Sequence, residues 1–287
     1  MTSIVSRERP FQENRLPLLH LAQAQLNLLE TCPRKFQYIF LDHAGSLVTE
    51  EQQERLTWGS RFHLLMQQWE LGLPVEPLVL EDSELRRCFE ALLAADPELF
   101  QALPAGGKKT RWSEHRRTLE LQGCLLTVIY DLLILQPKSA QILDWKTYPK
   151  PHHQTQLAQN WQTRLYLYVL AETTDYAPEQ LSMTYWFVQL GAEGASYPEQ
   201  VTFRYSTDWH EQTCQDLNRL MNRLLRWIDP GLEPGLASLL LPQVAPEEGL
   251  CLACPFQVRC QRDQNQPGSS PPIDLWFDLA EIEEVVL

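Results

Sequence analysis

The spacing of hydrophobic residues divides the chain into a helical front section and a longer section of mixed pattern. In residues 20–104 apolar side chains recur every three or four positions, as in Trp58, Phe62, Leu65 and Met66. This spacing places them on one face of a helix. The pattern predicts helices at 20–41, with an interruption near Pro33, at 50–71 and at 81–101.

After the glycine pair Gly106 and Gly107 the pattern becomes that of β-strands, with runs rich in apolar and β-branched residues. It predicts strands at 112–121, 124–135 and 140–147, a helix at 155–173, strands at 181–190 and 200–206, and a helix at 208–228. Three strands, a helix, two strands and a helix form the order of an α/β fold. We therefore expect a mixed central sheet flanked by helices.

We expect one large domain over residues 1–263, with a helical section at about 20–104 and a core at about 110–228. Residues 264–287 begin with a Pro- and Ser-rich stretch and end in an acidic, apolar segment. They are expected to form a flexible linker and an acidic amphipathic tail.

Composition excludes several classes of protein. The formal net charge is −13, which argues against a general nucleic-acid-coating protein but not against an enzyme with local phosphate contacts. No apolar run approaches the roughly 18 residues needed to cross a bilayer, and the N-terminus lacks the apolar core of a signal peptide. We therefore expect a cytoplasmic protein without a membrane partner.

Two aspartates are predicted to face each other across a hairpin. Asp131 interrupts an apolar strand, and a lone buried carboxylate is costly unless it is paired or binds a metal. A four-residue turn over 136–139, with Pro137 in its second position, pairs Leu135 with Ala140 and so places Asp131 opposite Asp144. A divalent cation between these acids would turn their repulsion into attraction.

Asp144 also begins an Asp-x-Lys sequence. Strand alternation places Asp144 and Lys146 on one face, while Trp145 points away. Carboxylates that hold Mg²⁺, with a lysine that orients water or offsets charge, are what hydrolysis of a phosphodiester requires. The alternative is a structural Asp–Lys ion pair with a separately satisfied Asp131.

Other polar residues have positions that suit such a site. His63 lies one helical turn after Gly59, and a position without a side chain there would let another backbone approach the imidazole. The alternative is an ordinary core or surface histidine. Gln162 and Tyr166 are four residues apart and share a helix face, where they could contact a phosphate or form an ordinary polar rim. The position of Glu114 favours a solvent-facing side chain, with a supporting role at the metal as the alternative.

Four cysteines have the spacing of a metal site. Cys251, Cys254 and Cys260 form a C-x2-C-x5-C sequence, and Cys32, just before a proline, supplies a fourth candidate ligand. Such a site would join segments more than 200 positions apart and would be structural. The spacing allows either zinc or an iron-sulfur cluster. Three further cysteines are predicted to be core thiols, namely Cys88, Cys124 and Cys214.

Taken together, these motifs resemble the RecB-like branch of the PD-(D/E)XK nucleases. Within that branch they are similar to the iron-sulfur group, which contains AddB-type helicase-nuclease domains and CRISPR-associated RecB-like exonucleases. The resemblance extends from about residue 20 to residue 262. It rests on the motifs Cys32-Pro33-Arg34-Lys35-Phe36, Gly59-x-x-x-His63, Asp131, Asp144-Trp145-Lys146, Gln162-x-x-x-Tyr166 and Cys251-x2-Cys254-x5-Cys260.

The resemblance implies a restriction-endonuclease-like fold with an iron-sulfur clasp that joins the N- and C-terminal regions. It implies that Mg²⁺ or Mn²⁺ is held by His63, Asp131, Asp144 and the carbonyl of Trp145. Lys146 is then catalytic, with Gln162 and Tyr166 beside it. It further implies that a [4Fe-4S] cluster is held by Cys32, Cys251, Cys254 and Cys260.

The implied activity is metal-dependent DNA cleavage, by an exonuclease acting on ends or single strands. The pathway would be repair, recombination or CRISPR-type processing, with a helicase or a CRISPR-adaptation protein as partner. One departure is that Val128-Ile129-Tyr130 precedes Asp131, where family members often have Gly-Arg-Ile. The alternative function is a non-catalytic or complex-dependent DNA-binding subunit with a structural iron-sulfur or zinc site.

Overall fold

The computed structural model describes residues 19–45, 50–100, 110–188, 197–228, 240–252 and 254–262. Its strands are β1 (Leu19–Leu21), β2 (Arg111–Leu121), β3 (Cys124–Gln136), β4 (Ser139–Lys146), β5 (Leu181–Phe187) and β6 (Glu199–Arg204). Its α-helices are α1 (Gln23–Thr31), α2 (Pro33–Phe36), α3 (Glu50–Glu70), α4 (Glu76–Leu80), α5 (Ser83–Ala95), α6 (Gln154–Gln159), α7 (Trp161–Glu172) and α8 (Thr207–Ile228). Short helical turns are η1 (Gln37–Leu41), η2 (Pro178–Gln180) and η3 (Pro246–Glu248).

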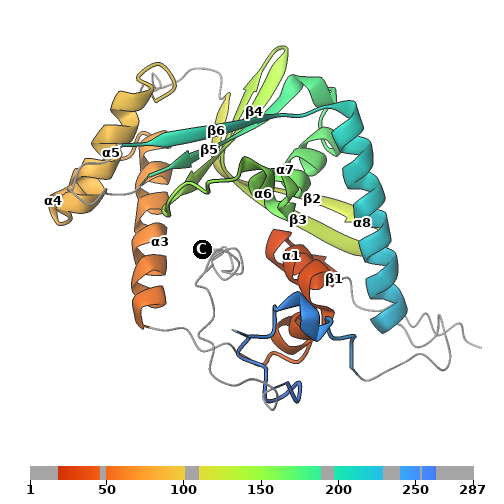
Figure 1. The fold of residues 1–287 in the computed structure, drawn as a ribbon. Helices are drawn as coiled ribbons and strands as arrows, with labels where there is room; N and C mark the ends of the chain where they lie inside the picture. The colour runs from red at the N-terminus through yellow and green to blue at the C-terminus, as the bar shows by residue number, and fades with distance from the viewer. Residues whose placement is uncertain are drawn as a thin grey trace, which may run out of the picture.

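The six strands form one mixed sheet with helices on both faces (Figure 1), which confirms the predicted α/β class. The path β1-β3-β4-β5-β6 runs across the sheet, and β2 pairs with β3 from the side. Pairing is parallel for β1 with β3 and for β4 with β5, and antiparallel for β2 with β3, β3 with β4, and β5 with β6.

Strand β3 divides one of its edges between two partners. Because β2 occupies one edge along nearly the whole strand, β1 and β4 must share the other. Strand β1 pairs with residues Cys124 to Leu126 of β3, and β4 pairs with residues Leu132 to Gln136. The ladder pairs of this edge therefore leave a gap over residues 127–131, and Asp131 lies at its end.

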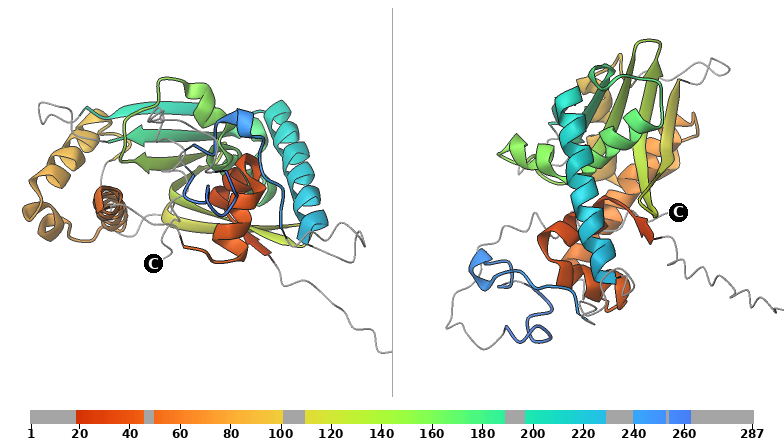
Figure 2. Two further views of the ribbon diagram at one scale, coloured as in Figure 1. Left: turned by 60° about the horizontal axis from the view of Figure 1, so that its bottom comes forward. Right: turned by 90° about the vertical axis from the view of Figure 1, so that its right-hand side faces the viewer.

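Apolar side chains form one cluster on each face of the sheet. The first contains residues of α1, α7 and α8, and the second contains residues of α3 and α5. Successive residues of β4 go to opposite clusters: Ile142 belongs to the first and Leu143 to the second. In the turned views of Figure 2, α7 and α8 lie on one side of the sheet and α3 on the other.

Most of the predicted elements are confirmed, with three corrections. Residues Leu19–Leu21 form the strand β1, where a helix was expected from residue 20. The helix predicted at 155–173 is broken at Asn160, whose extended backbone separates α6 from α7. A short helix, α4, precedes α5. The end of the strand predicted at 181–190, and the tail predicted at 264–287, lie outside the described residues.

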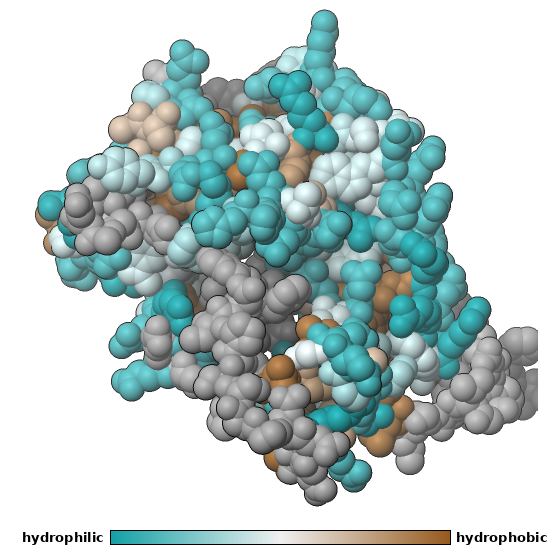
Figure 3. Space-filling view, viewed as in Figure 1, coloured by the Kyte–Doolittle hydropathy of each residue, from teal (hydrophilic) through white to brown (hydrophobic). Residues whose placement is uncertain are grey.

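The surface in the view of Figure 3 is largely hydrophilic, with apolar side chains in small separate areas. Among the helices that the structure describes, none combines the length and the apolar composition that crossing a bilayer requires.

Candidate functional site

The candidate site lies where β3 and β4 separate, at a point that we call the fork. Ladder pairs run from Gln136–Ser139 to Leu132–Leu143, which is the register predicted from the turn. Asp131 and Asp144 follow the last of these pairs, one on each strand. Both are buried, with exposed fractions of 4% and 1%, so each carboxylate needs specific partners.

Asp131 is held by the backbone of the opposite strand. Its Oδ2 accepts a hydrogen bond from the N–H of Trp145 at 2.7 Å. The regular alternation of β3 also changes here, because Tyr130 packs in the first apolar cluster and Leu132 in the second. In an undistorted strand residues two apart point to the same face. The local distortion turns Asp131 toward the gap between the strands.

Asp144 and Lys146 lie on the same side of β4, as predicted, while Trp145 packs against Phe100 in the second cluster. Lys146 Nζ lies 2.6 Å from Asp144 Oδ1, and Gln162 of α7 donates from Nε2 to Asp144 Oδ2 at 2.7 Å. Burial raises the pKa of Asp144 to about 6, although the charge of Lys146 opposes this shift. Burial alone would lower the pKa of Lys146, but Asp144 raises it above its ordinary value.

His63 reaches the fork from α3. Its Nδ1 lies 3.5 Å from Asp131 Oδ1, and its Nε2 lies 3.1 Å from the carbonyl oxygen of Trp145. Burial alone would lower the pKa of His63, but the charge of Asp131 and a hydrogen bond to it raise the pKa to about 9. About one third of the His63 side chain is exposed, 33%, so the site opens to solvent on this side.

The close approach of α3 to the end of β4 depends on Gly59. A Cβ atom at this position would lie 3.0 Å from Thr147 Oγ1, which is tighter than ordinary van der Waals contact. Thr147 directly follows Lys146. The atom nearest to Gly59 is a side-chain hydroxyl and not the backbone that was predicted to approach the imidazole, and it belongs to the residue that follows the Asp-x-Lys sequence.

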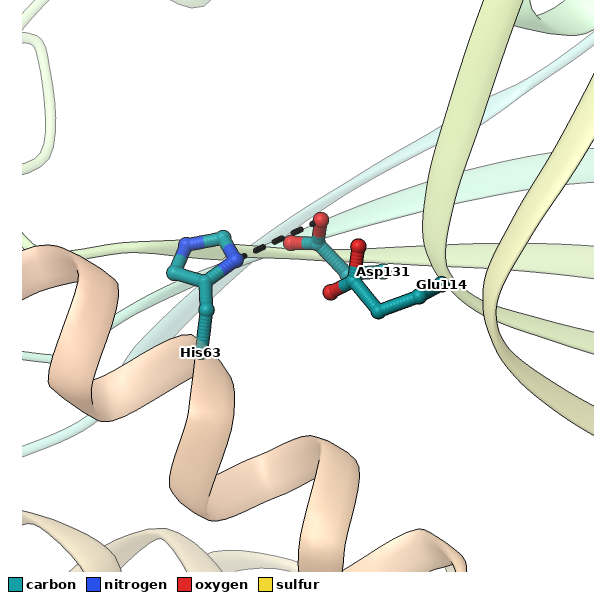
Figure 4. A group of neighbouring side chains, drawn as sticks. All are labelled: His63, Glu114 and Asp131. Atoms are coloured by element: carbon teal, nitrogen blue, oxygen red, sulfur yellow. Dashed lines mark ion pairs between the residues drawn. The ribbon is translucent and has the colours of Figure 1, made fainter. Parts of the chain in front are cut away.

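Glu114 completes a compact group of possible metal ligands with His63 and Asp131. One donor atom from each residue lies within 4.8 Å of the others, and Figure 4 shows their side chains converging from α3 and the sheet. In the ladder of β2 with β3, Glu114 falls opposite Asp131, between the pairs Ser113–Leu132 and His115–Tyr130. Glu114 has a positive φ of 48°, so β2 is distorted at the same level as β3.

The expected solvent-facing position of Glu114 is therefore wrong. Its side chain is half-buried beside Asp131, and burial together with the charge of Asp131 raises the pKa of Glu114 to about 7. Sequence reasoning underrated it because the register of β2 against β3 cannot be fixed before the turn between them is known. The imidazole and two carboxylates form a donor set that suits a divalent cation such as Mg²⁺ or Mn²⁺.

Tyr166, one turn after Gln162 on α7, lies deeper than that residue. It is fully buried, its ring packs edge-on against Tyr130 with centroids 5.4 Å apart, and its carbonyl accepts a hydrogen bond from Tyr130 Oη. The ring of Tyr185 is the nearer aromatic neighbour of Lys146, with Nζ 5.4 Å from its centroid, and the ring of Tyr148 lies at 6.0 Å. Tyr148 could have been noticed from the sequence, because it is two residues after Lys146.

The four candidate cysteine ligands come from two segments that are far apart in sequence, and among the described residues their sulfur atoms do not form a compact ligand group like that of His63, Glu114 and Asp131. Cys251 and Cys254 are each influenced electrostatically by Cys32 and by Cys260, and burial raises the pKa of both. All four are half-buried and free of disulfides. Figure 1 shows residues 240–262 beside α1 and α2. Of the three predicted core thiols, Cys88 and Cys124 are buried, and Cys214 is half-buried.

Protein contacts also hold these two segments together, and we call this joined region the clasp. Arg34 Nε donates to the carbonyl of Leu241 at 2.6 Å, and the N–H of Leu241 donates to Gln37 Oε1 at 2.7 Å. The rings of Tyr38 and Phe256 lie 5.2 Å apart. The N- and C-terminal segments are thus joined by buried hydrogen bonds and aromatic packing.

Comparison with protein families identifies the superfamily of the chain. A model of the PD-(D/E)XK nuclease superfamily matches residues 20–261. This chain belongs to the PD-(D/E)XK nuclease superfamily. Asp131 and Asp144-Trp145-Lys146 lie within the matched residues. Nucleases of this superfamily use divalent metals, which agrees with the donor set at the fork.

Comparison with solved structures supports the fold of this PD-(D/E)XK nuclease. The chain is similar to the crystal structure of a "Putative exonuclease" from Eubacterium rectale, with a TM-score of 0.50, 13% identity, and coverage of 96% of this chain and 98% of that one. The crystal structure of SSO0001 is matched with 12% identity, coverage of 88% and 89%, and a TM-score of 0.38. No curated protein matches the sequence.

Proposed function

We propose that this protein is a divalent-cation-dependent nuclease that hydrolyses phosphodiester bonds in DNA, at free ends or in single strands. The observation that carries the proposal is the fork itself. A donor group of His63, Glu114 and Asp131 lies beside the Asp144–Lys146 pair at one opening between two strands. Neither part alone would distinguish a hydrolytic site from a structural ion pair.

The cation would be held by His63 and Asp131, with Asp144, Glu114 and the carbonyl of Trp145 as further donors at the same opening. A bound Mg²⁺ or Mn²⁺ would polarise the scissile phosphate and lower the pKa of an attacking water. The roles of Asp131 and His63 are supported by their short separation of 3.5 Å. The role of the Trp145 carbonyl is supported by its position 3.1 Å from His63 Nε2.

Lys146 would be the catalytic lysine, which contributes a positive charge in addition to that of the metal ion. Its ammonium group remains charged at neutral pH, because the neighbouring Asp144 raises its pKa. In that form it orients water or offsets the negative charge that develops on the phosphate. Gln162 restrains the other oxygen of Asp144, so that Oδ1 stays with the lysine. Tyr166, one turn after Gln162, would help to hold α7 in place by packing against Tyr130 of β3.

A cleavage assay tests this function. End-labelled single- and double-stranded DNA is incubated with Mg²⁺ or Mn²⁺ and the wild-type protein, Asp144→Asn or Lys146→Met. We expect each variant to lose about 100-fold or more of the wild-type rate while it remains folded, although loss of one partner of a buried ion pair lowers its unfolding temperature. Lys150→Met is the matched control, because Lys150 pairs with Glu199 outside the fork, and it should cleave at the wild-type rate.

Two results of this assay would count against the proposal. Cleavage by both fork variants at the wild-type rate would remove Asp144 and Lys146 from the reaction. DNA binding by the wild-type protein without cleavage, with either metal, would favour a DNA-binding subunit that acts only within a complex. That alternative is motivated by the net charge of −13 and by Val128-Ile129-Tyr130 before Asp131.

We further propose that Cys32, Cys251, Cys254 and Cys260 hold a [4Fe-4S] cluster, with zinc as the alternative. Their spacing in the sequence, and the hydrogen bonds that join the segment after Cys32 to Leu241, support a shared site. Protein purified without oxygen should contain iron and absorb visible light, and Cys254→Ser should lose both properties, whereas Cys88→Ser should keep them. A colourless protein with one zinc per chain would assign the site to zinc.

The cellular role would be cytoplasmic DNA repair, recombination or CRISPR-type processing, with a helicase or CRISPR-adaptation protein as partner.

A further inference from the structure

We propose that Asn27 is a positioning residue that ties the cysteine-bearing helix α1 to Gln162 at the fork. This inference rests on the proposed function, because it concerns how the Asp144 carboxylate is oriented for cation binding. Asn27 lies on α1, which ends at Thr31, next to Cys32. Gln162 lies in the first turn of α7, 135 positions further along the chain.

The beginning of α7 needs hydrogen-bond acceptors from outside the helix. The first N–H groups of any helix have no partner within it. Asn160 is the N-cap residue, and its Oδ1 accepts from the N–H of Gln162 at 2.7 Å. That bond leaves the preceding N–H, that of Trp161, to be satisfied by another group.

Asn27 supplies that group and also binds the cap. Its Oδ1 accepts from the N–H of Trp161 at 3.0 Å, and its Nδ2 donates to Asn160 Oδ1 at 3.2 Å. One amide side chain of α1 therefore contacts both residues that precede Gln162. A second contact of α1 reinforces the junction, because Trp161 Nε1 donates to Glu30 Oε2 at 2.7 Å.

The junction sets the position of the Gln162 side chain. Gln162 is buried, with an exposed fraction of 8%, and its Nε2 donates to Asp144 Oδ2 at 2.7 Å. A shift of the first turn of α7 would lengthen this bond and free the Asp144 carboxylate to rotate. The chain of contacts thus runs from the helix that ends beside Cys32, through Asn27 and Asn160, to a carboxylate at the fork.

A double-mutant cycle on cation binding tests the inference. The dissociation constant of Mn²⁺ is measured by calorimetry for the wild-type protein, Asn27→Ala, Gln162→Ala and the double variant. We expect each single variant to bind Mn²⁺ about 2- to 10-fold more weakly, the range that loss of one hydrogen bond gives. If Asn27 acts through Gln162, the dissociation constant of the double variant should be no larger than the larger of the two single-variant values.

Asn27→Asp and Thr31→Ala complete the design. Asn27→Asp has the same shape and keeps the acceptor for Trp161 N–H but loses the donor to Asn160, so it remains informative should Asn27→Ala not fold, and it should also weaken Mn²⁺ binding. Thr31→Ala changes the last turn of the same helix and should bind Mn²⁺ as the wild type does.

Effects of Asn27→Ala and Gln162→Ala that multiply in the double variant would overturn the inference, as would wild-type affinity in both Asn27 variants. Because the measurement is of Mn²⁺ binding, it separates this inference from the proposed function. If the effects of Asn27→Ala and Gln162→Ala on Mn²⁺ binding are not independent, but the wild-type protein cleaves no DNA, the positioning role stands and the nuclease activity is rejected.

Discussion

The carboxylate of Asp131 accepts a hydrogen bond from the backbone N–H of Trp145 at 2.7 Å. A side chain of β3 therefore satisfies a group of β4 just beyond the last ladder pair, Leu132–Leu143. The same carboxylate faces His63 through its other oxygen. Asp131 thus closes the end of the ladder and at the same time presents one oxygen at the fork.

This double role predicts different effects for two substitutions of Asp131. Asp131→Asn keeps an acceptor for Trp145 N–H but removes the charge that faces His63, so it should weaken Mn²⁺ binding strongly and lose the stabilisation that the His63–Asp131 charge pair gives. Asp131→Ala leaves the buried N–H without its partner and should lower the free energy of unfolding by about 1–3 kcal/mol more than Asp131→Asn. Chemical denaturation and Mn²⁺ calorimetry on both variants check this, and equal stability of the two would contradict it.

The contact between Gly59 and Thr147 predicts a second pair of variants. Gly59→Ala places a Cβ 3.0 Å from Thr147 Oγ1, so Thr147 or α3 must move by a few tenths of an ångström, and we expect this to change the position of His63 relative to the Asp-x-Lys sequence. Helix propensity favours alanine by about 1 kcal/mol, so we expect the rate of DNA cleavage to fall while the melting temperature changes little. Adding Thr147→Ala removes the opposing hydroxyl and should restore part of the rate.

Ser60→Ala is the matched control on α3, because Ser60 is exposed and bonds to its own helix. It should cleave DNA at the wild-type rate. If Gly59→Ala and Ser60→Ala behave alike, the close approach at Gly59 has no functional consequence.

The raised pKa of His63 predicts how stability without divalent cations depends on pH. The pKa rises from 6.5 to about 9 in the folded protein, so the folded state binds this proton more tightly than the unfolded state does. The stabilisation is therefore fully present below about pH 6.5 and is lost as the pH rises through about 9.

The melting temperature of the wild-type protein, compared with that of His63→Gln in a chelator, measures this contribution. We expect the difference between the two proteins to be largest near pH 6 and to disappear above about pH 9. A difference that stays constant over this range would show that the charge on His63 does not stabilise the fold.

The hydrogen bonds of the clasp predict that its protein contacts are stabilising even without a bound metal. Gln37→Ala removes the acceptor of the buried Leu241 N–H and should lower the free energy of unfolding by about 1–3 kcal/mol. Denaturation is measured on metal-free protein for this variant and for Gln154→Ala, at the start of α6 outside the clasp. An equal, small effect of the two substitutions would mean that the clasp depends on its metal alone.

Local sequence signals predicted the elements and their register well. The alternation of apolar residues and the proline at the second position of the turn gave the pairing Leu135–Ala140. The ladder ends at Leu132–Leu143, one pair before the predicted pairing of Asp131 with Asp144. These signals depend on neighbours within one hairpin. Such short-range geometry is set by the backbone dihedrals of a few residues, so the order of residues determines it.

Only the tertiary structure decided which distant residues complete the site. Glu114 joins His63 and Asp131 because β2 and β3 are distorted at the same level, and Asn27 reaches α7 because α1 packs across its first turn. Burial and hydrogen bonds between segments that are far apart in sequence stabilise these arrangements. No local pattern encodes them, because their free energy appears only when the whole chain packs together.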